Sequence, residues 1–345
     1  MLKAIKLENF RNHLGSEFSL GELNIIVGRN GIGKSNILEA ISIISCCRSF
    51  RNEDKRNLIH YGADYTRVSS HDFEIFLQRN PKLLFQAKYK GTRRKKSEYI
   101  GLLPSVIFSP ETMEIITGSP QERRRFLDVM ISQADRLYLD SLIAFEKARL
   151  ERNNLLQMIR EGRSNRDELE FWNQELVGRG LEVTAGREKV INFLNKHILT
   201  FYRKVSGAKS ELMVKYQRSA ELNYRERLRE IEMREIQTGH TLIGPHRDDF
   251  IVVLDGKDMA KYGSRGEVRS AILALKMAEV NYIEQNPVNS VSKPILLLDD
   301  IFSEFDKFHR LHLFKLIEGY QTIITTTDKE FVDPVLLKRA NLIEL

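Results

Sequence analysis

The sequence predicts a mixed α/β fold that is divided by an inserted helical arm. An apolar strand leads into a glycine-rich turn and a helix near the start of the chain, and a second apolar strand near the end stops at two aspartates. Between them lies a proline-free stretch with helical apolar spacing. We therefore expect the α/β part to comprise residues 1–120 and 236–345, and the arm to comprise residues 121–235.

Composition and charge indicate a globular chain without a membrane span. The 345 residues are 42% hydrophobic and 29% charged, with a formal net charge of +7. No stretch reaches the ~18 uninterrupted apolar residues of a membrane helix, and the N-terminus carries no apolar export signal. Cys46 and Cys47 are adjacent and lack metal-ligand spacing, which is typical of the reducing cytosol. We expect a cytoplasmic protein, and its small positive excess is weak evidence for a nucleic-acid partner.

Two short strands and a helix are expected in the first 44 residues. Apolar patterning predicts strands at Leu2–Leu7 and Leu23–Val27, and the first of them ends at a polar turn, Asn9–Asn12. A helix should run from Lys34 to about Ile44, directly after the glycine-rich turn.

A basic hairpin is predicted near the end of the first segment. The pattern is strand-like from Asp64 to Phe108, and two runs, residues 84–90 and 96–100, stand on either side of Gly91. Four adjacent cations lie near its tip: Arg93, Arg94, Lys95 and Lys96. Contact with DNA phosphates and a solvated tip are both open interpretations. No aromatic residue interrupts the run, so base stacking is not indicated there.

The arm is predicted to hold two helices that pack on each other rather than on another chain. The first begins near Tyr138, and a turn at residues 162–165 separates it from a longer helix. Apolar residues recur on one face of the longer helix: Leu169, Trp172, Leu176, Val183, Val190, Leu194, Ile198 and Phe201. After Gly239 the pattern returns to strands at residues 250–255, 295–298 and 322–328, with a helix at residues 269–281.

The glycine-rich turn predicts a site for nucleotide phosphates. Its residues fit the pattern G-x-x-x-x-G-K-[ST]: Gly28, Arg29, Asn30, Gly31, Ile32, Gly33, Lys34 and Ser35. Glycines let backbone N–H groups and the helix N-terminus, which includes Asn36, surround phosphate oxygens. Lys34 is expected to reach the β- and γ-phosphates of ATP, and Ser35 is expected to hold Mg²⁺.

Two carboxylates at the end of the second apolar strand complete this prediction. Ile295–Leu298 is the continuous apolar run of a buried parallel strand, and Asp299 and Asp300 follow it. Asp299 is expected to lie on the Mg²⁺ side. Asp300 is expected to orient or deprotonate the attacking water, with Lys34 as the other catalytic residue.

A second candidate anion site precedes a predicted helix. The run Tyr262–Glu267 places Ser264 and Gly266 at a helix N-terminus, about 32 residues before Asp299. It resembles the signature loop of ABC-type ATPases, which closes on the nucleotide of the opposing subunit. The short loop Ser303–Asp306 resembles the D-loop of the same class. A simple N-capped helix is the alternative for the first of these loops.

Seven motifs in order resemble the RecF family of bacterial recombination mediators from end to end. Besides the glycine-rich turn and its helix, they are Asn9–Asn12, Arg48–Arg51, Gly118–Pro120, Arg123–Asp128, Gly244–Asp249 and Leu296–Asp306, the last of which includes the two aspartates. The resemblance implies a P-loop ABC-type ATPase head, with a mixed sheet and helices, like the heads of chromosome-maintenance ATPases. It also implies a short helical arm in place of a long coiled coil.

A function and further site residues are implied by the same resemblance. A RecF-type protein binds ATP and Mg²⁺, forms an ATP-dependent homodimer on duplex, gapped or junction DNA, and helps RecR and RecO to load RecA in recombinational repair and replication restart. It is a weak, DNA-stimulated ATPase whose hydrolysis acts as a switch. The resemblance adds residues to the site. Arg11 and Asn12 would contact ATP, and Ser303 and Asp306 would belong to the D-loop. Ser264, Gly266 and Glu267 would form the signature loop, which contacts the ATP of the opposing subunit (in trans). Capping of a strand is the alternative for Arg11 and Asn12.

Several residues depart from the transporter members of the ABC class. The carboxylate after Asp299 is Asp300 rather than the usual, longer Glu. The last strand ends without a histidine, no glutamine stands around residues 109–111, and Arg265 and Glu267 replace the usual Gly and Gln. Weak acid–base groups beside an intact phosphate site predict slow hydrolysis, which suits a timed clamp.

Other classes and structural roles remain as alternatives. A transporter subunit would need the missing glutamine and histidine, and a structural tether would need an arm longer than the ~60 Å of the second helix. Arg123–Arg125 either bind phosphate or brace the arm. His246, Asp248 and Asp249 either ligate a metal or make turn hydrogen bonds, and the second is favoured. A kinase catalytic loop is excluded, because Val253 stands where that loop needs Asn.

Overall fold

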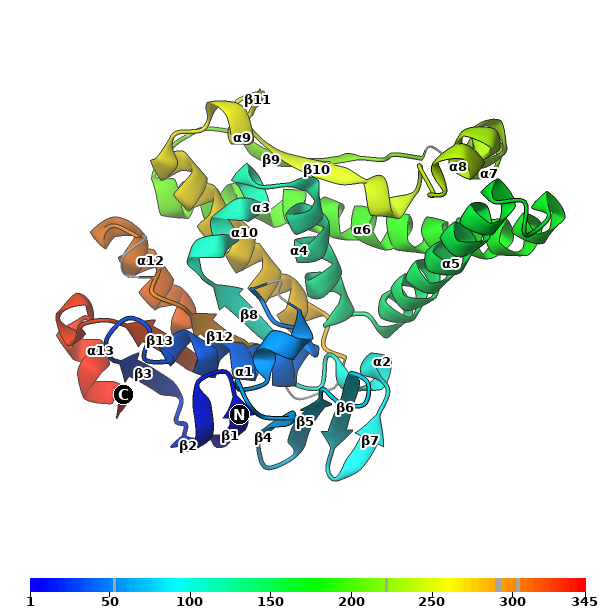
Figure 1. Cartoon of the computed structure of the whole chain (residues 1–345). Helices are drawn as coiled ribbons and strands as arrows, with labels where there is room; N and C mark the ends of the chain where they lie inside the picture. Colours follow the sequence, from blue (N-terminus) through cyan, green and yellow to red (C-terminus); the bar gives the residue numbers. More distant parts are fainter. Residues whose placement is uncertain (52–53, 221–222, 289–292, 302–304) are drawn as a thin grey trace. The chain divides into compact units, whose positions relative to one another are not determined.

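The computed structural model describes residues 1–51, 54–220, 223–288, 293–301 and 305–345. Its contacts divide the chain into two compact units (Figure 1). Unit 1 comprises Met1–Met113, Phe201–Ala208 and Arg269–Leu345, and unit 2 comprises Glu114–Thr200 and Lys209–Val268. Residues 236–268 therefore group with the inserted unit, whereas the sequence pattern placed them with the α/β part. The functional division into head and arm stays a prediction.

Unit 1 contains a parallel and an antiparallel sheet. The parallel sheet has the order β14-β3-β13-β12-β8, and its strands are β3 (Leu23–Val27), β8 (Ser105–Phe108), β12 (Ile295–Leu298), β13 (Thr322–Thr326) and β14 (Asn341–Glu344). The antiparallel sheet has the order β2-β1-β4-β5-β6-β7, with β1 (Ala4–Phe10), β2 (His13–Ser19), β4 (Tyr65–Ser69), β5 (Phe73–Gln78), β6 (Leu84–Tyr89) and β7 (Thr92–Arg94). Every residue of β12 is buried, as its continuous apolar run predicts.

Helix α1 (Lys34–Cys46) lies between these two sheets. It contacts β1, β4 and β5 of one sheet and β8 and β13 of the other. Its apolar residues are fully buried, because a helix that is apolar on all sides must be covered on all sides. The other helical elements of unit 1 are η1 (Lys55–Leu58), α2 (Lys96–Tyr99), η2 (Pro110–Met113), α10 (Arg265–Gln285, within unit 1 from Arg269), α12 (Lys307–Ile317), η5 (Lys329–Phe331) and α13 (Pro334–Arg339).

Two local predictions for unit 1 were wrong. Residues 96–100 form the short helix α2 rather than a strand, because the Glu98 carboxylate accepts a hydrogen bond from the Lys95 N–H and caps the turn. The hairpin partner of β6 is instead β7, after a turn at Lys90 and Gly91. The polar turn after the first strand is shorter than predicted, since β1 continues to Phe10 and a second strand, β2, pairs with it.

Unit 2 is mainly helical and also holds a small antiparallel sheet of order β11-β10-β9. Its helical elements are α3 (Glu114–Thr117), α4 (Pro120–Ser132), α5 (Arg136–Arg160), η3 (Arg166–Glu168), α6 (Leu169–Ser206, within unit 2 to Thr200), α7 (Tyr224–Glu230), α8 (Glu232–Thr238), η4 (Pro245–Arg247) and α9 (Met259–Tyr262). Its strands are β9 (Leu212–Gln217), β10 (Asp249–Leu254) and β11 (Lys257–Asp258), of which β9 was not predicted. The predicted packing of the two long helices is confirmed, since Ser141 of α5 donates to Glu182 of α6 at 2.7 Å.

A fully buried ion pair joins three helices of unit 2. Arg152 of α5 donates to Glu235 of α8 at 2.6 Å and to Asn173 of α6 at 2.7 Å. Both charged side chains have 0% exposure, and burial raises the pKa of the Glu235 carboxyl while Arg152 opposes that rise. An apolar cluster of Leu155, Leu156, Leu169 and Ile236 lies in the same helices. Removal of one partner would therefore leave the other charge buried and uncompensated.

Glu235→Gln is expected to lower the free energy of unfolding by about 3–5 kcal/mol, because Arg152 then lacks its counter-ion. Urea denaturation measures this change. The control is Glu230→Gln, whose partner Arg227 is half exposed, and for which a change below about 1 kcal/mol is expected. Equal denaturation midpoints for the two variants would contradict the assigned role of the buried pair.

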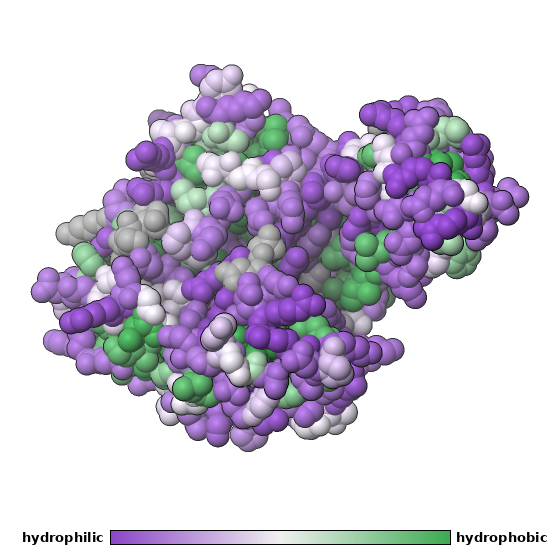
Figure 2. Space-filling view, viewed as in Figure 1, coloured by the Kyte–Doolittle hydropathy of each residue, from purple (hydrophilic) through white to green (hydrophobic). Residues whose placement is uncertain are grey.

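The face of the molecule shown in Figure 2 is mainly hydrophilic. Hydrophobic residues on the face shown form several separate groups, as is normal for globular proteins. In the part of the chain that the structure describes, no helix has the length and apolar character needed to cross a membrane.

Candidate functional site

The glycine-rich turn lies at the carboxyl end of β3 and leads into α1. Gly31 and Gly33 have φ angles of 81° and 116°, a left-handed conformation that glycine adopts without strain. A Cβ on Gly33 would also lie within 2.8 Å of the side chains of Asn12 and His13. No side chain caps the N-terminus of α1. The Asn36 N–H already donates to the Gly33 carbonyl at 3.0 Å, so an anion such as a nucleotide phosphate would use the N–H groups that precede it.

The carboxyl ends of β3, β12 and β13 bring the predicted Mg²⁺ residues together. Ser35 and Thr325 both donate hydrogen bonds of 2.7 Å to the same Asp299 oxygen, Oδ1. The Asp300 N–H donates to Thr325 Oγ1 at 3.0 Å. Burial raises the pKa of the Asp299 carboxyl, and the two hydroxyl donors oppose that rise. Asp300 adopts a φ of 45°, which aspartate tolerates better than most residues.

The oxygens of Ser35 and Asp299 fit a Mg²⁺ site. Ligands at 2.0–2.1 Å in octahedral geometry stand roughly 2.9 Å apart at right angles, and these two oxygens are already 2.7 Å apart. No group of three or more His, Cys, Asp or Glu side chains in the described residues could hold a metal. Mg²⁺ commonly uses one or two protein oxygens together with phosphates and water, so this small ligand set is sufficient.

Lys34 is held by the loop that it follows. Its Nζ donates to the carbonyl oxygens of Gly28 at 2.6 Å and Arg29 at 3.0 Å. Burial lowers the pKa of the Lys34 ammonium, while the carboxylates of Asp300 and Asp299 oppose that change. The Lys34 ammonium is thus bonded to the glycine-rich turn, called the P-loop below (Gly28–Ser35), and is stabilised by the charge of both carboxylates. A phosphate chain would replace the two carbonyl contacts.

A pocket of about 260 Å³ opens at this end of the parallel sheet. It is lined by Asn30, Gly31, Gly33, Lys34, Ser35, Asn36, Arg51, Asp300 and Thr325. Pockets that enclose a whole small ligand usually measure roughly 300–1,000 Å³, so this one suits the phosphate end of a nucleotide. The rest of the nucleotide would lie outside this pocket, where a second protein surface can contact it.

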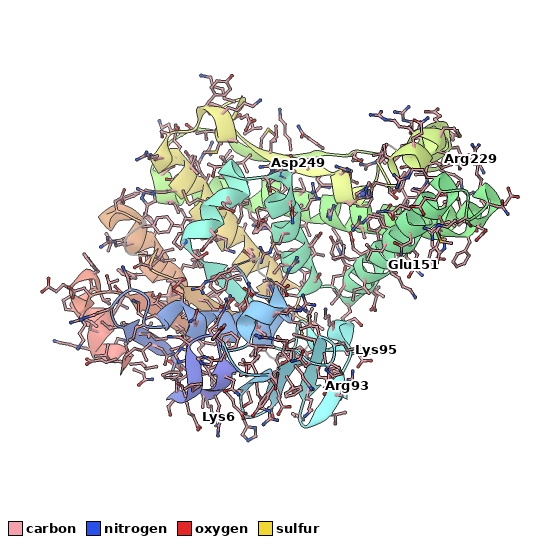
Figure 3. The ribbon with its side chains drawn as sticks, viewed as in Figure 1. Lys6, Arg93, Lys95, Glu151, Arg229 and Asp249 are labelled. Atoms are coloured by element: carbon pink, nitrogen blue, oxygen red, sulfur yellow. The ribbon has the colours of Figure 1, made fainter. Side chains whose placement is uncertain are left out.

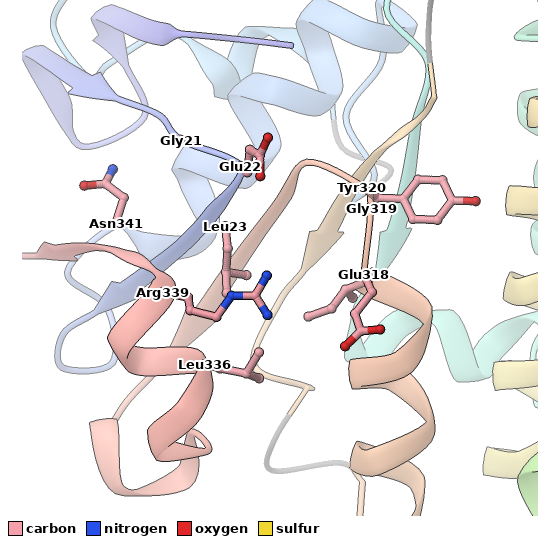
Figure 4. A pocket seen from close by; sticks show the side chains of 10 residues that line it. Gly21, Glu22, Leu23, Glu318, Gly319, Tyr320, Leu336, Arg339 and Asn341 are labelled. Carbon is pink, nitrogen blue, oxygen red and sulfur yellow. The ribbon is translucent and has the colours of Figure 1, made fainter.

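A second pocket of unit 1, about 350 Å³, lies at the opposite ends of the strands (Figure 4). Leu23 and Asn341 begin β3 and β14, and both line it together with the charged side chains of Glu22, Glu318 and Arg339. Parallel α/β sheets bind ligands outside the carboxyl ends of their strands. The smaller pocket at the P-loop is therefore the candidate nucleotide site.

A buried carboxylate on α1 organises the residues around the P-loop. Glu39 has 0% exposure and accepts two hydrogen bonds from the Arg11 guanidinium, at 2.7 and 2.9 Å, and one from Ser49 at 2.5 Å. Arg51 lies 3.5 Å from the same carboxylate. Arg11 thus ties the turn after β1 to α1. Its contact with ATP stays a prediction.

Two asparagines extend this network to the P-loop. Asn12 donates to the carbonyl of Ile32 and accepts from Asn36, both at 2.8 Å. Arg51 donates to the side-chain oxygen of Asn36, Oδ1, at 2.8 Å and also lines the pocket. Sequence reasoning did not place Arg51 or Glu39 at the site. The single acidic residue of a largely buried helix was the available signal, because a buried carboxylate needs cationic or hydroxyl partners.

The predicted signature residues belong to unit 2, where they form a helix cap. The amide and hydroxyl of Ser264 both donate to Glu267 Oε2 at 2.8 Å, and the Glu267 N–H donates to Ser264 Oγ at 3.3 Å. This reciprocal capping box begins α10. The Glu267 carboxylate accepts from the Ser264 amide and hydroxyl, which are donors that a phosphate would use. Gly266 lies between Ser264 and Glu267 in the sequence. The trans contact of these residues with ATP stays a prediction.

Of the two predicted D-loop residues, Ser303 lies outside the described residues and Asp306 caps α12. Asp306 accepts from the N–H groups of Phe308 and His309 at 3.0 Å each and from His309 Nδ1 at 2.8 Å. The other nitrogen of His309, Nε2, lies 2.8 Å from the hydroxyl of Ser270 on α10. This buried histidine, which sequence reasoning missed, links the cap to the helix that follows the signature.

The four basic residues near the predicted hairpin tip lie on separate elements. Arg93 and Arg94 belong to β7, Lys95 precedes α2, and Lys96 begins it. All four side chains are exposed, and Arg93 and Lys95 are marked in Figure 3. Their contact with DNA stays a prediction.

The structural interpretation fits the other basic and acidic motifs, all within unit 2. Arg123 forms two hydrogen bonds, of 2.7 and 2.8 Å, with Asp249 and so braces α4 against β10. Asp248 accepts from Tyr216 and from the Ser219 N–H. His246 Nε2 bonds the carbonyl of residue 241 at 3.0 Å. These contacts are turn and brace interactions rather than metal ligation.

Comparisons with known proteins agree with this architecture. The chain matches the family described as RecF/RecN/SMC N terminal domain over residues 1–339. The DNA replication and repair protein RecF of Lachnoclostridium phytofermentans is 36% identical over 351 residues, which cover 96% of this chain and 94% of that protein. A solved structure of the recombination mediator protein RecF with ATP, in the RecFOR pathway, has a TM-score of 0.88 at 32% identity and covers 96% of this chain and 93% of its own.

A more distant likeness concerns the fold alone. A solved Smc head domain derived from Pyrococcus furiosus, with an extended coiled coil and bound to the C-terminal domain of ScpA, has a TM-score of 0.54 at 17% identity. It covers 99% of this chain and 92% of its own. Together these likenesses confirm the predicted fold class, an α/β ATPase head that carries a helical insertion.

Proposed function

The chain belongs to the RecF family, within the RecF/RecN/SMC N-terminal-domain proteins, and on that premise we propose that it is an ATP-dependent DNA-binding protein of recombinational repair and replication restart. One observation supports this most directly. The P-loop, the Ser35–Asp299 pair and Asp300 meet at one edge of the parallel sheet. The relatives named above add the link to DNA replication, repair and ATP.

ATP binding is assigned to residues from three elements. The N–H groups at the start of α1 surround the phosphates, and Lys34 donates to the β- and γ-phosphates after it leaves the carbonyls of Gly28 and Arg29. Ser35 and Asp299 would hold Mg²⁺, which neutralises charge on the phosphates when bound. Arg51 lies at the pocket and adds a positive charge that the sequence did not assign.

Hydrolysis is expected to be slow and to act as a switch. Asp300 is the proposed general base for the attacking water, and its side chain is one methylene shorter than glutamate. Thr325 stands near the end of β13 and uses its hydroxyl to position Asp299 and the Asp300 backbone. A hydroxyl in this role fixes geometry but supplies no positive charge to the γ-phosphate. We expect the ATP-bound state to last long enough to hold DNA.

An ATP-dependent homodimer completes the proposed site. The pocket covers only the phosphate end of ATP, so a second surface is needed, and the Ser264 loop of the partner is the candidate. The closed dimer would hold duplex or gapped DNA and assist RecR and RecO in loading RecA. The test is retention of a short DNA duplex with ATP and with ADP. Stronger retention with ATP supports the proposal, and equal retention with both nucleotides, or none, would overturn it.

Glu267→Gln is expected to strengthen ATP-dependent dimerisation by about 2- to 5-fold, since a carboxylate at a helix N-terminus is worth roughly 0.3–1 kcal/mol and competes with phosphate for that position. Glutamine preserves the capping box with Ser264 but carries no charge. The concentration dependence of the dimer mass in ATP measures the effect. Glu226→Gln, an exposed substitution in the same unit, should leave it unchanged. Weaker dimerisation of the Glu267 variant would contradict the competition.

A further inference from the structure

Two lysines stand beside the ring of Phe85, which lies on β6 of the antiparallel sheet in unit 1. Lys55 Nζ lies 4.1 Å from the ring centre, and Lys96 Nζ lies 5.5 Å from it. Burial lowers the pKa of Lys55, and the charges of Lys96 and Arg48 both act on it and lower its pKa further. They come from separate segments: Arg48 follows α1, Lys55 begins η1, and Lys96 begins α2.

No carboxylate among the described residues balances this group. Besides burial, the positive charges of Lys96 and Arg48 both lower the pKa of Lys55, and the Cys47 thiol opposes them. The nearest acidic residue in sequence among those described, Asp54, instead caps η1 and pairs with Arg56 at 3.3 Å. Among the described residues the group therefore holds an excess of positive charge, which an external anion would balance.

The aromatic ring keeps the two ammonium groups together in spite of their repulsion. A cation over an aromatic face is attracted by the ring quadrupole, while two like charges in contact repel. Burial, together with Lys96 and Arg48, lowers the pKa of Lys55 to about 8. Lys55 is half-buried and Lys96 is exposed, so a ligand can reach both nitrogens.

We propose that Lys55 and Lys96, held over Phe85, form a phosphate-binding site for the backbone of DNA; this inference rests on the proposed function. One phosphate group has enough acceptor oxygens to take a hydrogen bond from each lysine, and its charge replaces their repulsion by attraction. The site presents ammonium groups and no base-reading side chain, so it binds DNA of any sequence. Lys96 thus acts together with Lys55 rather than with its sequence neighbours in the basic run. The sequence pattern did not indicate any role for Lys55.

The test is the affinity for a short duplex, with ATP present, across a range of salt concentrations. The double variant Lys55→Gln/Lys96→Gln should weaken binding for all sequences alike. It should also reduce the slope of log affinity against log salt by about one for each phosphate that the lysines no longer neutralise. The double variant Lys55→Arg/Lys96→Arg should keep the slope. Lys293→Gln is the matched control, because Lys293 also stands over an aromatic ring, Tyr320, at 5.2 Å.

Thermal melting separates binding from a structural role. If the lysines serve a ligand, Lys55→Gln removes a like-charge repulsion and the melting temperature does not fall. An unchanged salt slope in the Gln double variant, or a slope that changes equally in Lys293→Gln, would overturn the site while the proposed function stands. Failure of the unaltered protein to retain duplex with ATP would overturn both.

Discussion

Lys34→Ala is expected to abolish the increase in DNA retention that ATP produces. The Lys34 ammonium donates to the carbonyls of Gly28 and Arg29, and the charges of Asp299 and Asp300 act on it. A hydrogen bond to a charged group contributes about 1.5–3 kcal/mol, so loss of even one phosphate contact of the ammonium should weaken ATP binding roughly 10- to 150-fold. At ATP concentrations that saturate the unaltered protein, the variant would remain largely without nucleotide.

Two titrations check this result: the binding of ATP, and the retention of duplex DNA with and without ATP. Lys6→Ala is the matched control, because Lys6 is an exposed lysine of β1 in the same unit. The control should behave as the unaltered protein in both titrations. ATP-dependent retention of DNA by the Lys34 variant at undiminished strength would contradict the assignment of the P-loop as the switch.

Asp300→Asn is expected to trap a stable ATP-bound dimer. Removal of a general base commonly slows a reaction by about 10²- to 10⁴-fold, while the phosphate contacts of the P-loop remain. Asparagine also accepts the positive φ of 45° that residue 300 adopts, and alanine would be strained there. The substitution therefore removes the carboxylate with little change to the backbone.

Light scattering measures this outcome. The chain has a mass of 40.1 kDa, and the variant should show twice that mass in ATP for longer than the unaltered protein does. Asp299→Asn is the control, since loss of the Mg²⁺ residue should prevent closure rather than prolong it. An Asp300 variant that stays monomeric in ATP would contradict the closed-dimer mechanism.

Features that depend on contiguous residues could be predicted from the sequence. The apolar runs of β3 and β12, the glycine-rich turn and the two aspartates are each local, and their order alone places them at one edge of a parallel sheet. The long amphipathic helix could also be predicted, because its apolar face repeats along most of its 38 residues. These parts account for the fold class and for the core of the nucleotide site.

Features that depend on distant partners could not be predicted. Glu39 accepts hydrogen bonds from Arg11 and Ser49, which lie on two other segments. Thr325 donates a hydrogen bond to Asp299 from the neighbouring strand. No local pattern shows such pairings. The strand predicted at residues 96–100 was wrong for a related reason, since one capping contact of Glu98 outweighs alternating hydrophobicity in a run of five residues.

The lysine pair illustrates the same limit from the functional side. Sequence grouping joined Lys96 to Arg93, Arg94 and Lys95 because they are adjacent. In the folded chain Lys96 faces Phe85 and Lys55, which lies 41 positions earlier in the sequence. Charge clusters that bind a ligand are defined by convergence in space, and a run of basic residues is only an indirect sign of one.

The measurement that tests the account most directly is mass and duplex-DNA retention determined on the same sample, with ATP and with ADP. We expect a dimer that retains DNA in ATP, and a monomer that releases DNA in ADP. A mass that does not depend on the nucleotide, or equal DNA retention in both, would contradict it.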